Sequence, residues 1–300
     1  MQDSLHQPEG GDGLEAWLHG RVPDKGLKPK AAAVLDVMLS QPRRASYGTA
    51  AELAELAGAN TATVTRTAQA LGFAGWPALQ QELRARYLAA LSAPEVAAEH
   101  TDIGKAEAPA IAAIHRDLEN LALLARRIDV EAVRTLAEAI AAARRTIVVA
   151  IGSYSAVGVA LAHNAQLAGY DITLATGYGG GGPANAVAAM TDQDVLVAIS
   201  FWRLNQTSVV AAEQARARGA RVFAVTDAAS PVLTRAAERV LLVPAEGVAF
   251  FPSLTAGLAL AQAIVTELAT IDPARTRTAI EQAEAQWTSF GLLHRRPRNP

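Results

Sequence analysis

The chain has 300 residues, of which 51% are hydrophobic and 19% charged, and its formal net charge is −2. This balance excludes an intrinsically disordered chain, and the length favours two packed domains. Because the chain contains no cysteine, disulfides, thiolate metal sites and cysteine nucleophiles are excluded. No Lys or Arg and no continuous apolar run occurs in residues 1–20, and the most apolar stretches, 146–151 and 254–265, are too short or too interrupted to span a bilayer. We therefore expect a cytoplasmic protein with no membrane partner.

Short helical patterns fill the first third of the chain. Residues 1–13 are polar and glycine-rich, and we expect a disordered tail there. Apolar spacing predicts helices over 14–18, 29–40, 50–57, 61–71 and 76–91. Pro42 is expected to end the second of these helices, and Gly72 the fourth. Together they predict an all-α domain over residues 14–91.

The charge of this domain differs from that of the rest of the chain. Between Arg21 and Ala90 there are nine Lys or Arg residues and five Asp or Glu residues, a balance of nine minus five, or +4. A basic segment attached to an acidic body is typical of a protein that contacts phosphate groups. A solvated helical face would give the same excess.

The helices at 50–57 and 61–71 have the spacing of a helix-turn-helix. Ala54 is the small residue needed where the two helices touch, and Gly58 can adopt the left-handed backbone of the turn. Thr49 and Glu52 have capping-box spacing, and Asn60 is a natural N-cap. Hydroxyl, guanidinium and amide groups suit phosphates and base edges. The residues predicted to contact DNA are Asn60, Thr61, Thr63, Thr65, Arg66 and Gln69. An ordinary helical hairpin is the alternative.

Several stretches of this domain are similar to a known family: Leu27-Lys-Pro-Lys30, Ala-Ala-Glu-Leu-Ala-Glu-Leu-Ala-Gly at 50–58, Thr63-Val-Thr-Arg66, and Leu-Gly-Phe-Ala-Gly-Trp-Pro-Ala-Leu at 71–79. Over about residues 14–90 the chain resembles the N-terminal domain of RpiR-type (MurR/RpiR) transcriptional regulators. The resemblance implies a double-stranded DNA operator as partner. Two positions depart from the family. Lys28 stands where a capping Thr or Ser is usual, and Thr67 where a buried aromatic is usual.

The pattern changes after a segment at 92–109, which contains two prolines and is predicted to be a linker. Helices are then expected over 110–127 and 130–143, and again over 253–270 and 273–289. Between them lie short apolar runs at 146–151, 172–174, 195–200, 222–226 and 240–243. This alternation predicts a doubly wound α/β domain with a five-stranded parallel sheet over 110–290, followed by a loose tail at 291–300. The fold class is therefore an α+β chain of two domains.

Turns that carry hydroxyl groups follow three of these strands. Ligands of open parallel sheets bind beyond the carboxyl ends of the strands. The predicted ligand-binding residues are Gly152, Ser153, Tyr154, Ser155, Ser200, Arg203, Thr207, Thr226 and Asp227. A single hydroxyl at a strand end can be an N-cap alone, but three converging loops favour a site. The turn at Gly152–Ser155 lacks the spacing G-x-G-x-x-G, so NAD is not expected. The run Gly177–Gly182 is expected to be a surface connection.

Residues 130–270 resemble the sugar isomerase (SIS) domain. The resemblance is carried by residues 150–155, 194–201, 218–227, 230–233 and 250–253. It implies that the small-molecule effector is a sugar phosphate or a related sugar derivative. Two positions depart from the family here as well. The loop at 200–207 replaces the common Ser-x-Ser-Gly-x-Thr loop, and Tyr154 stands in place of an Arg of the nearest branch.

SIS folds also occur in aldose–ketose isomerases, which need a positioned base. Glu246 and His163 are the candidates, but a solvated loop carboxylate and a packed histidine explain them better. The six histidines are scattered, so no metal, cofactor or catalytic residue is expected. A sensor is favoured over an isomerase, and over an adaptor that binds proteins alone. Self-association into a dimer or tetramer through the α/β domain is also expected, because one helix-turn-helix buries too little surface for specificity.

Overall fold

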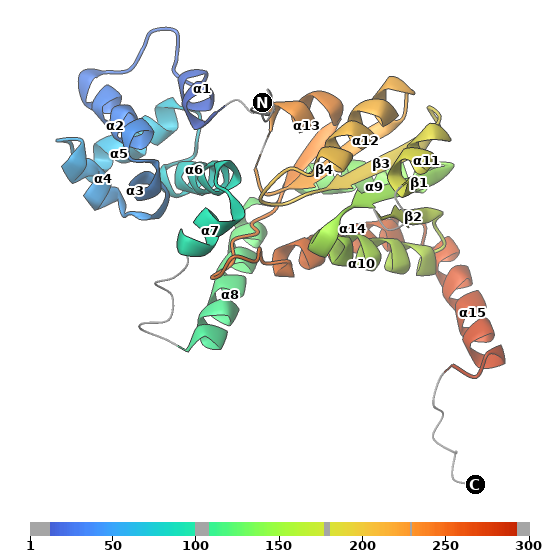
Figure 1. Ribbon diagram of the computed structural model, residues 1–300. Helices are drawn as coiled ribbons and strands as arrows, with labels where there is room; N and C mark the ends of the chain where they lie inside the picture. Colours follow the sequence, from blue (N-terminus) through green and yellow to red (C-terminus); the bar gives the residue numbers. More distant parts are fainter. Residues whose placement is uncertain (1–12, 100–107, 177–180, 229, 293–300) are drawn as a thin grey trace, which may run out of the picture. The chain divides into compact units, whose positions relative to one another are not determined.

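The computed structural model describes residues 13–99, 108–176, 181–228 and 230–292. The chain divides into two compact units, Met1–Val96 and Ala97–Pro300 (Figure 1). The expected tails at 1–12 and 293–300, the linker residues 100–107 and most of the glycine run (177–180) lie outside the described residues. Within the described ranges, no helix has both the length and the apolar character needed to cross a membrane.

The first unit is a group of helices packed around one hydrophobic core. The helices are α1 (Leu14–His19), α2 (Pro29–Ser40), α3 (Pro42–Tyr47), α4 (Ala50–Leu56), α5 (Thr61–Ala70), α6 (Trp76–Ala90) and α7 (Ala93–Glu99), the last of which runs past the boundary of the unit. Their apolar residues recur at helical spacing, so that each helix has one inward face. The hydrophobic side chains with least exposure are Leu18, Val34, Met38, Ala45, Val64, Ala68, Leu79 and Leu83.

Two of these helices differ from the sequence expectations. Pro42 does not simply end a helix, since it also occupies the first turn of α3, where the missing N–H breaks no hydrogen bond. Helix α7 lies in the segment that was expected to be a linker, and Val96 is buried. Pro94 is again in a first turn, where proline is tolerated. The described beginning of the expected linker is therefore helical.

The second unit is an α/β sandwich (Figure 1). Its strands are β1 (Arg145–Ala150), β2 (Ile172–Ala175), β3 (Asp194–Ile199), β4 (Arg221–Thr226) and β5 (Arg239–Leu242), which lie in the order β2-β1-β3-β4-β5. All four neighbouring pairs are parallel. The doubly wound parallel sheet predicted from the sequence is confirmed.

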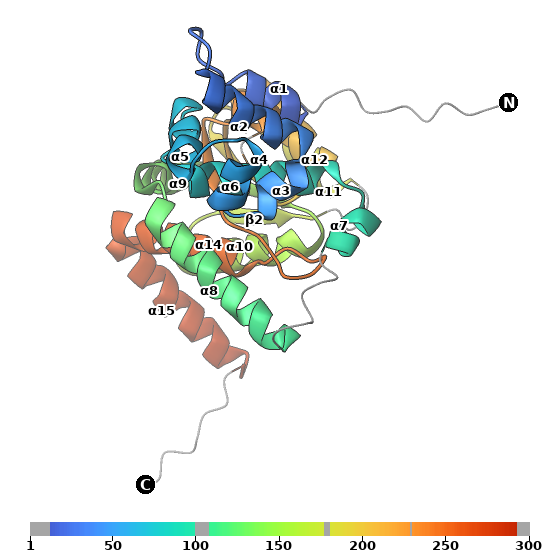
Figure 2. The same ribbon diagram turned by 90° about the vertical axis from the view of Figure 1, so that its left-hand side faces the viewer.

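Helices cover both faces of this sheet. One face is covered by α9 (Val130–Ala142), α10 (Ser155–Leu167) and α14 (Thr255–Ile271), and α14 in turn contacts α8 (Pro109–Arg127) and α15 (Pro273–Ser289). Both views show α8, α10, α14 and α15 gathered on this side (Figures 1 and 2). The other face is covered by α11 (Gly182–Ala188), α12 (Gln206–Ala217) and α13 (Pro231–Ala236).

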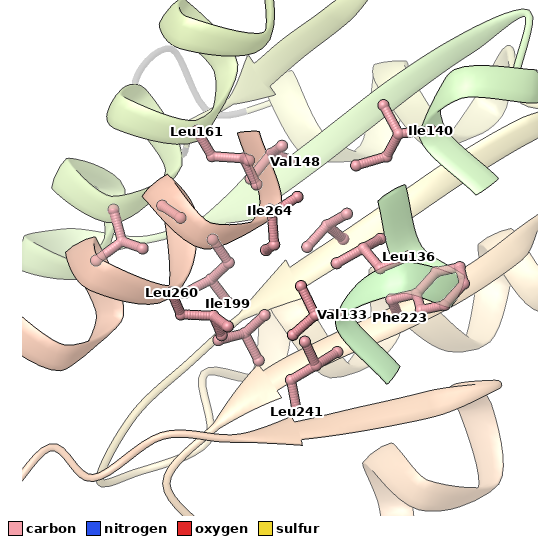
Figure 3. Packing of buried hydrophobic residues seen from close by; sticks show 14 of the residues in the cluster. Val133, Leu136, Ile140, Val148, Leu161, Ile199, Phe223, Leu241, Leu260 and Ile264 are labelled. Carbon is pink, nitrogen blue, oxygen red and sulfur yellow. The ribbon is translucent and has the colours of Figure 1, made fainter. Parts of the chain in front are cut away.

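The central strands supply side chains to both hydrophobic layers. Val195, Val197 and Ile199 belong to the cluster under α9 and α14, whereas Leu196 and Ala198 belong to the cluster under α12. Figure 3 shows the first cluster, in which Ile199 lies near Leu260 of α14. Successive side chains of a strand point to opposite faces, so a sheet covered on both faces requires continuous apolar runs.

The strand order decides where a ligand can bind. Strand β1 has β2 on one side and β3 on the other, so the chain order reverses between β1 and β3. In such sheets the connections leave the carboxyl edge in opposite directions at this point and open a crevice. The turns after β1, β3 and β4 lie at that edge.

Candidate DNA-binding helix and effector site

The turn between α4 and α5 has the geometry that the sequence predicted for a helix-turn-helix. Thr49 Oγ1 accepts the Glu52 N–H, and Glu52 Oε2 accepts the Thr49 N–H at 2.6 Å, so the capping box is present. Gly58 has φ +57, in the left-handed region. Asn60 Oδ1 accepts the Thr63 N–H at 2.9 Å and caps α5. These caps determine where each helix begins.

One face of α5 is open to solvent. Thr61, Arg66 and Gln69 are exposed, and Thr65 is partly exposed. Thr63 does not belong to this face, contrary to the prediction. Its side chain is 8% exposed, and its hydroxyl donates to Asn60 Oδ1 at 3.0 Å and accepts from Arg66 Nη2 at 3.3 Å. Thr63 lies about one turn after the cap residue Asn60, on the side of the helix that faces the core. Its hydroxyl there orients Arg66 by accepting the guanidinium hydrogen bond.

The two departures from the family pattern have clear structural outcomes. Thr67 is completely buried, and its Oγ1 donates to the Thr63 carbonyl oxygen at 2.8 Å. A polar side chain therefore takes the interior position without leaving its hydroxyl unpaired. Lys28 precedes α2 and makes no side-chain cap, but Pro29 occupies the first turn. The preset φ of proline favours the start of this helix.

The turn after β1 leads directly into α10. Gly152 has φ +69, and Gly152–Tyr154 form a 3₁₀ turn. Ser155 begins α10, and its Oγ donates to the Gly152 carbonyl oxygen at 2.7 Å. No side chain caps this helix. The Ser155 N–H at its start donates to the Gly152 carbonyl oxygen, so the exposed Gly152 and Ser153 of the turn are the residues that face solvent for an anion or a hydroxyl-rich ligand.

Two of the predicted ligand hydroxyls are used inside their own loops. Ser200 is 1% exposed, and its Oγ donates to the Arg203 carbonyl oxygen at 3.3 Å and accepts the Asn205 N–H at 3.1 Å. Thr226 is also 1% exposed, and its Oγ1 donates to the Ala228 carbonyl oxygen at 3.3 Å. The expected convergence of exposed hydroxyls from three strand ends is therefore wrong. Short hydroxyls at strand ends here shape the loops.

Asp227 joins the loops after β3 and β4. Its Oδ1 accepts the Trp202 N–H at 2.8 Å. Trp202 has φ +64, and among the described residues it is the non-glycine residue with positive φ. Such a backbone costs about 1–3 kcal/mol and is retained where surrounding contacts enforce it. The bond to Asp227 is one such contact, and it holds Trp202 at the carboxyl edge of the sheet.

Burial dominates the electrostatics of this edge. It raises the pKa of Asp227 to about 6, against the opposing effect of hydrogen bonds from Trp202, Thr226 and backbone N–H groups. Burial also raises the pKa of Tyr154 to about 12, assisted by the charge of Asp227 and opposed by the charge of Arg203. Tyr154, Arg203 and Asp227 are therefore electrostatically coupled. The site offers a phenol donor, an exposed guanidinium and a poorly solvated carboxyl group.

Aromatic rings line the same edge, and of these the sequence singled out only Tyr154. The rings of Tyr154 and Phe201 lie 5.4 Å apart, and those of Trp202 and Phe250 lie 4.9 Å apart, both edge to face. Phe250 belongs to the loop that follows β5. A run of two aromatics directly after a buried strand, Phe201-Trp202, was the signal available in the sequence.

Thr207 faces a separate hollow. A cavity of about 450 Å³ lies between α11 and α12, with a mostly apolar wall. Its lining includes Pro183, Val187, Thr207, Val210, Gln214 and Arg218. Of the predicted ligand-binding residues, Thr207 alone lines it. The Thr207 N–H is bound to Asn205 Oδ1 at 2.9 Å, which caps α12.

The two candidate bases lie elsewhere. Glu246 Oε2 is 3.8 Å from Arg116 Nη1 on α8. His163 is exposed in the middle of α10, so the expectation of a packed histidine is wrong. Within the described ranges, no group of three His, Asp or Glu side chains could hold a metal ion.

Two family models match the chain. The model described as "Helix-turn-helix domain, rpiR family" matches residues 21–90, and the SIS domain model matches residues 139–267. The first match contains α2 to α6, and the second contains all five strands. The two predicted resemblances are thereby confirmed.

Known proteins and solved structures are also similar to the chain. An uncharacterized HTH-type transcriptional regulator, YfhH of Escherichia coli K12, is 26% identical over 244 residues, which is 78% of this chain and 83% of the relative. The sugar isomerase domain of an RpiR transcription factor from Sphaerobacter thermophilus is 27% identical, with TM-score 0.57, and covers 60% of this chain and 99% of its own. NanR of Vibrio vulnificus, complexed with ManNAc-6P, is 18% identical, with TM-score 0.58. The match covers 94% of this chain and 100% of the NanR chain, and it shows a shared fold.

Proposed function

Since the chain belongs to the RpiR-type transcriptional regulators, which join an rpiR-family helix-turn-helix to a SIS domain, we propose that α5 recognises operator DNA and that a sugar derivative bound at the Tyr154–Asp227 edge controls that binding. The observation that carries the proposal is the open face of α5, which presents hydroxyl, guanidinium and amide groups from a helix with a well-formed cap. The protein acts as a regulator and not as an isomerase.

The residues of α5 divide the work of DNA recognition. Arg66 and Gln69 have the reach and the donors to contact base edges in the major groove. Thr61 and Thr65 are short and suit phosphate oxygens near the start of the helix. Thr63 and Asn60 support these contacts indirectly. Thr63 orients Arg66, and Asn60 caps the helix. The excess of positive charge in this unit supports the same function.

The effector site combines groups from the turns after β1, β3 and β4. The turn before α10, with Gly152 and Ser153 exposed and Ser155 at the start of the helix, offers polar groups to a phosphate, and Arg203 provides a cation. Asp227 can accept hydrogen bonds from sugar hydroxyls. The aromatic ring of Trp202 offers an apolar surface to the C–H face of a sugar ring. A phosphosugar is the favoured ligand class, and the ManNAc-6P complex of the fold relative NanR supports it.

Supporting residues complete this site. Ser200 and Thr226 hold the two loops in place through their buried hydroxyls, whereas Thr207 faces the separate hollow between α11 and α12. The loops would otherwise lose the shape that brings Arg203 and Asp227 to one edge. The side chains of this site thus either contact the ligand directly or position the residues that do.

We propose that the protein lies in the cytoplasm, where its DNA target lies. The second unit also has a surface suited to self-association. Ile111, Ile114 and Leu118 recur on one side of α8 and are 47%, 61% and 58% exposed. Contiguous exposed apolar surface of this kind is typical of a subunit interface. Two subunits would align two α5 helices with half-sites about 34–36 Å apart, or a multiple of that distance.

Two measurements test the proposal. DNA from the region upstream of the protein's own gene should be retained at low salt and released as salt rises, with a slope set by the number of phosphate contacts. A thermal-shift screen of sugar phosphates and sugar acids should find a compound that stabilises the chain and changes the DNA affinity. If the chain binds DNA but no compound changes that affinity, the sensor half of the proposal is wrong.

A further inference from the structure

Helix α8 is held to its own unit by very little buried surface. All residues of α8 are described, and Asn120 and Leu124 are its two buried side chains. Asn120 is 4% exposed, and its Nδ2 donates to the Glu246 carbonyl oxygen at 2.8 Å. With so few apolar contacts, polar bonds have a large share in determining where the helix lies.

Asp117 adds a second polar attachment one turn earlier. Its Oδ1 accepts the Ser253 hydroxyl at 2.5 Å, and its Oδ2 accepts the Thr255 hydroxyl at 2.7 Å. Ser253 precedes α14, and Thr255 is the first residue of α14. Hydrogen bonds to a charged acceptor are shorter and stronger than neutral ones. Both attachments of α8 therefore end on the segment 246–255.

The same segment reaches the effector edge at its centre. Phe250 lies between Glu246 and Ser253, and its ring is 4.9 Å from the Trp202 ring. Trp202 is held in turn by Asp227 through a 2.8 Å bond. A displacement of the Trp202 loop must therefore move Phe250 or break that contact. The ends of the Phe250 segment are bonded to α8.

We infer that Asp117 and Asn120 are positioning residues, which couple the conformation of the Trp202 loop to helix α8 through the segment 246–255. The inference rests on the proposed sensor function, and it names the route by which an effector at Asp227 would act. In sequence, α8 is the first helix after the residues that join the two units. A shift of α8 thus acts on the chain that leads to the DNA-binding unit.

The coupling has two alternative states with discrete contacts. When the Trp202 loop has the conformation seen here, Phe250 packs against it and Asp117 keeps both hydroxyl partners. When a ligand displaces Trp202, the segment shifts and Asp117 loses a partner. Coupling of this kind is reciprocal, because each end must bias the other by the same factor.

The test uses Thr255, which can lose its hydroxyl without a change in shape. Thr255→Val removes the bond to Asp117, and Thr255→Ser keeps it. Thr266→Val is the matched control, since the Thr266 hydroxyl is exposed and bonds within α14 to the Gln262 carbonyl oxygen. The full-length protein is labelled with 5-fluorotryptophan, and Trp202→Phe identifies the ¹⁹F resonance of Trp202. Hydrogen exchange is measured on peptides covering 109–127.

Thr255→Val should shift the Trp202 resonance and raise exchange in α8, whereas Thr255→Ser and Thr266→Val should match the wild type. Asp227→Ala, which removes the acceptor of the Trp202 N–H, should raise exchange in the same α8 peptides, and its combination with Thr255→Val should raise it by less than the sum of the two. If Thr255→Val loosens α8 but leaves the Trp202 resonance unchanged, Asp117 is only an anchor and the inference is wrong. The same conclusion follows if Asp227→Ala leaves α8 unchanged.

Neither readout depends on sugar or DNA, so failure of the sensor function and failure of the coupling are distinguishable. For a sugar phosphate that changes wild-type DNA affinity, Thr255→Val should reduce that change toward onefold. The affinities for the sugar phosphate alone and for DNA alone should stay within about twofold, since a coupling residue contacts neither ligand. An undiminished response in Thr255→Val would overturn the inference.

Discussion

Replacing Asp227 by Asn should raise the free energy of unfolding of the second unit above that of the wild type. The difference between the two proteins should be larger at neutral pH than at acid pH. The amide has the shape of the carboxyl group and can still accept the Trp202 N–H, but it carries no charge at any pH. In the wild type, burial raises the pKa of Asp227 from 3.8 to about 6. The folded protein therefore holds this proton more tightly than the unfolded chain does.

The sign and size of the effect follow from linkage. Stability that is fully present below the unfolded pKa of 3.8 is lost as the pH rises through the folded value of about 6. A shift of about two units, at about 1.4 kcal/mol per unit, amounts to at most about 3 kcal/mol. Asp227 is partly exposed, and solvent relaxation should reduce this to about 1–3 kcal/mol. The Asp227→Asn variant does not lose this stability. The difference in unfolding free energy between the variant and the wild type should therefore grow between pH 4 and pH 7.

The assay is urea-dependent hydrogen exchange of peptides from β3 and β4, which reports the opening of the second unit separately from the first. The difference in unfolding free energy between Asp227→Asn and the wild type is measured at pH 4.5, 6 and 7.5. Asp129→Asn, at an N-cap outside the effector edge, is the control. A difference that is constant with pH would refute the reasoning, because it would mean that Asp227 ionises normally and that its carboxylate is well solvated.

The remaining predictions concern DNA, effector, packing and assembly. Arg66→Ala should lower the salt slope of DNA binding by about one if it contacts phosphate, or cost about 1–3 kcal/mol at one base pair if it contacts a base edge; unchanged operator affinity would exclude both. Arg203→Ala should weaken sugar-phosphate binding by about 1.5–3 kcal/mol in calorimetry, whereas Thr207→Ala should leave it unchanged, because Thr207 faces the separate hollow. Gly257→Ala should destabilise the second unit by about 1–3 kcal/mol in the exchange assay, because its Cβ would lie 3.1 Å from Phe201 and Val157. Light scattering should show that Ile114→Glu lowers the molecular mass from that of a dimer or tetramer at micromolar concentration, and a wild-type monomer would remove the basis of the proposed assembly.

Much of the architecture could be predicted from the sequence because its signals are local. Apolar residues at helical spacing located α2, α4, α5 and α6, and continuous apolar runs located the five strands to within one or two residues. The capping box at Thr49, the turn at Gly58 and the cap at Asn60 depend on neighbours within a few residues. Such features are determined by backbone geometry and by burial on one face.

The short helices α3 and α7 were missed for a related local reason. Pro42 and Pro94 were interpreted as helix breakers, whereas each occupies the first turn of a helix. A proline indicates a boundary, but the sequence does not tell whether a helix ends or begins there. The buried side chain of Val96 gives α7 a tertiary contact, and this contact was not visible in the local pattern.

The chemistry of the sites depended on contacts between distant residues. The sequence by itself determined the two families of domain, and it indicated the helix proposed to bind DNA and the strand ends proposed to bind a ligand. The tertiary structure alone decided that Ser200 and Thr226 point inward, that Thr63 supports Arg66, and that Asp227 bonds to Trp202 across 25 residues. It also brought Asp117 to Thr255, which lies 138 residues away. A hydroxyl or carboxyl group occupies the same position in the sequence whether it forms hydrogen bonds to a ligand or to its own loop. Which partner it finds is decided by packing that brings distant segments together, and residue spacing does not encode that information.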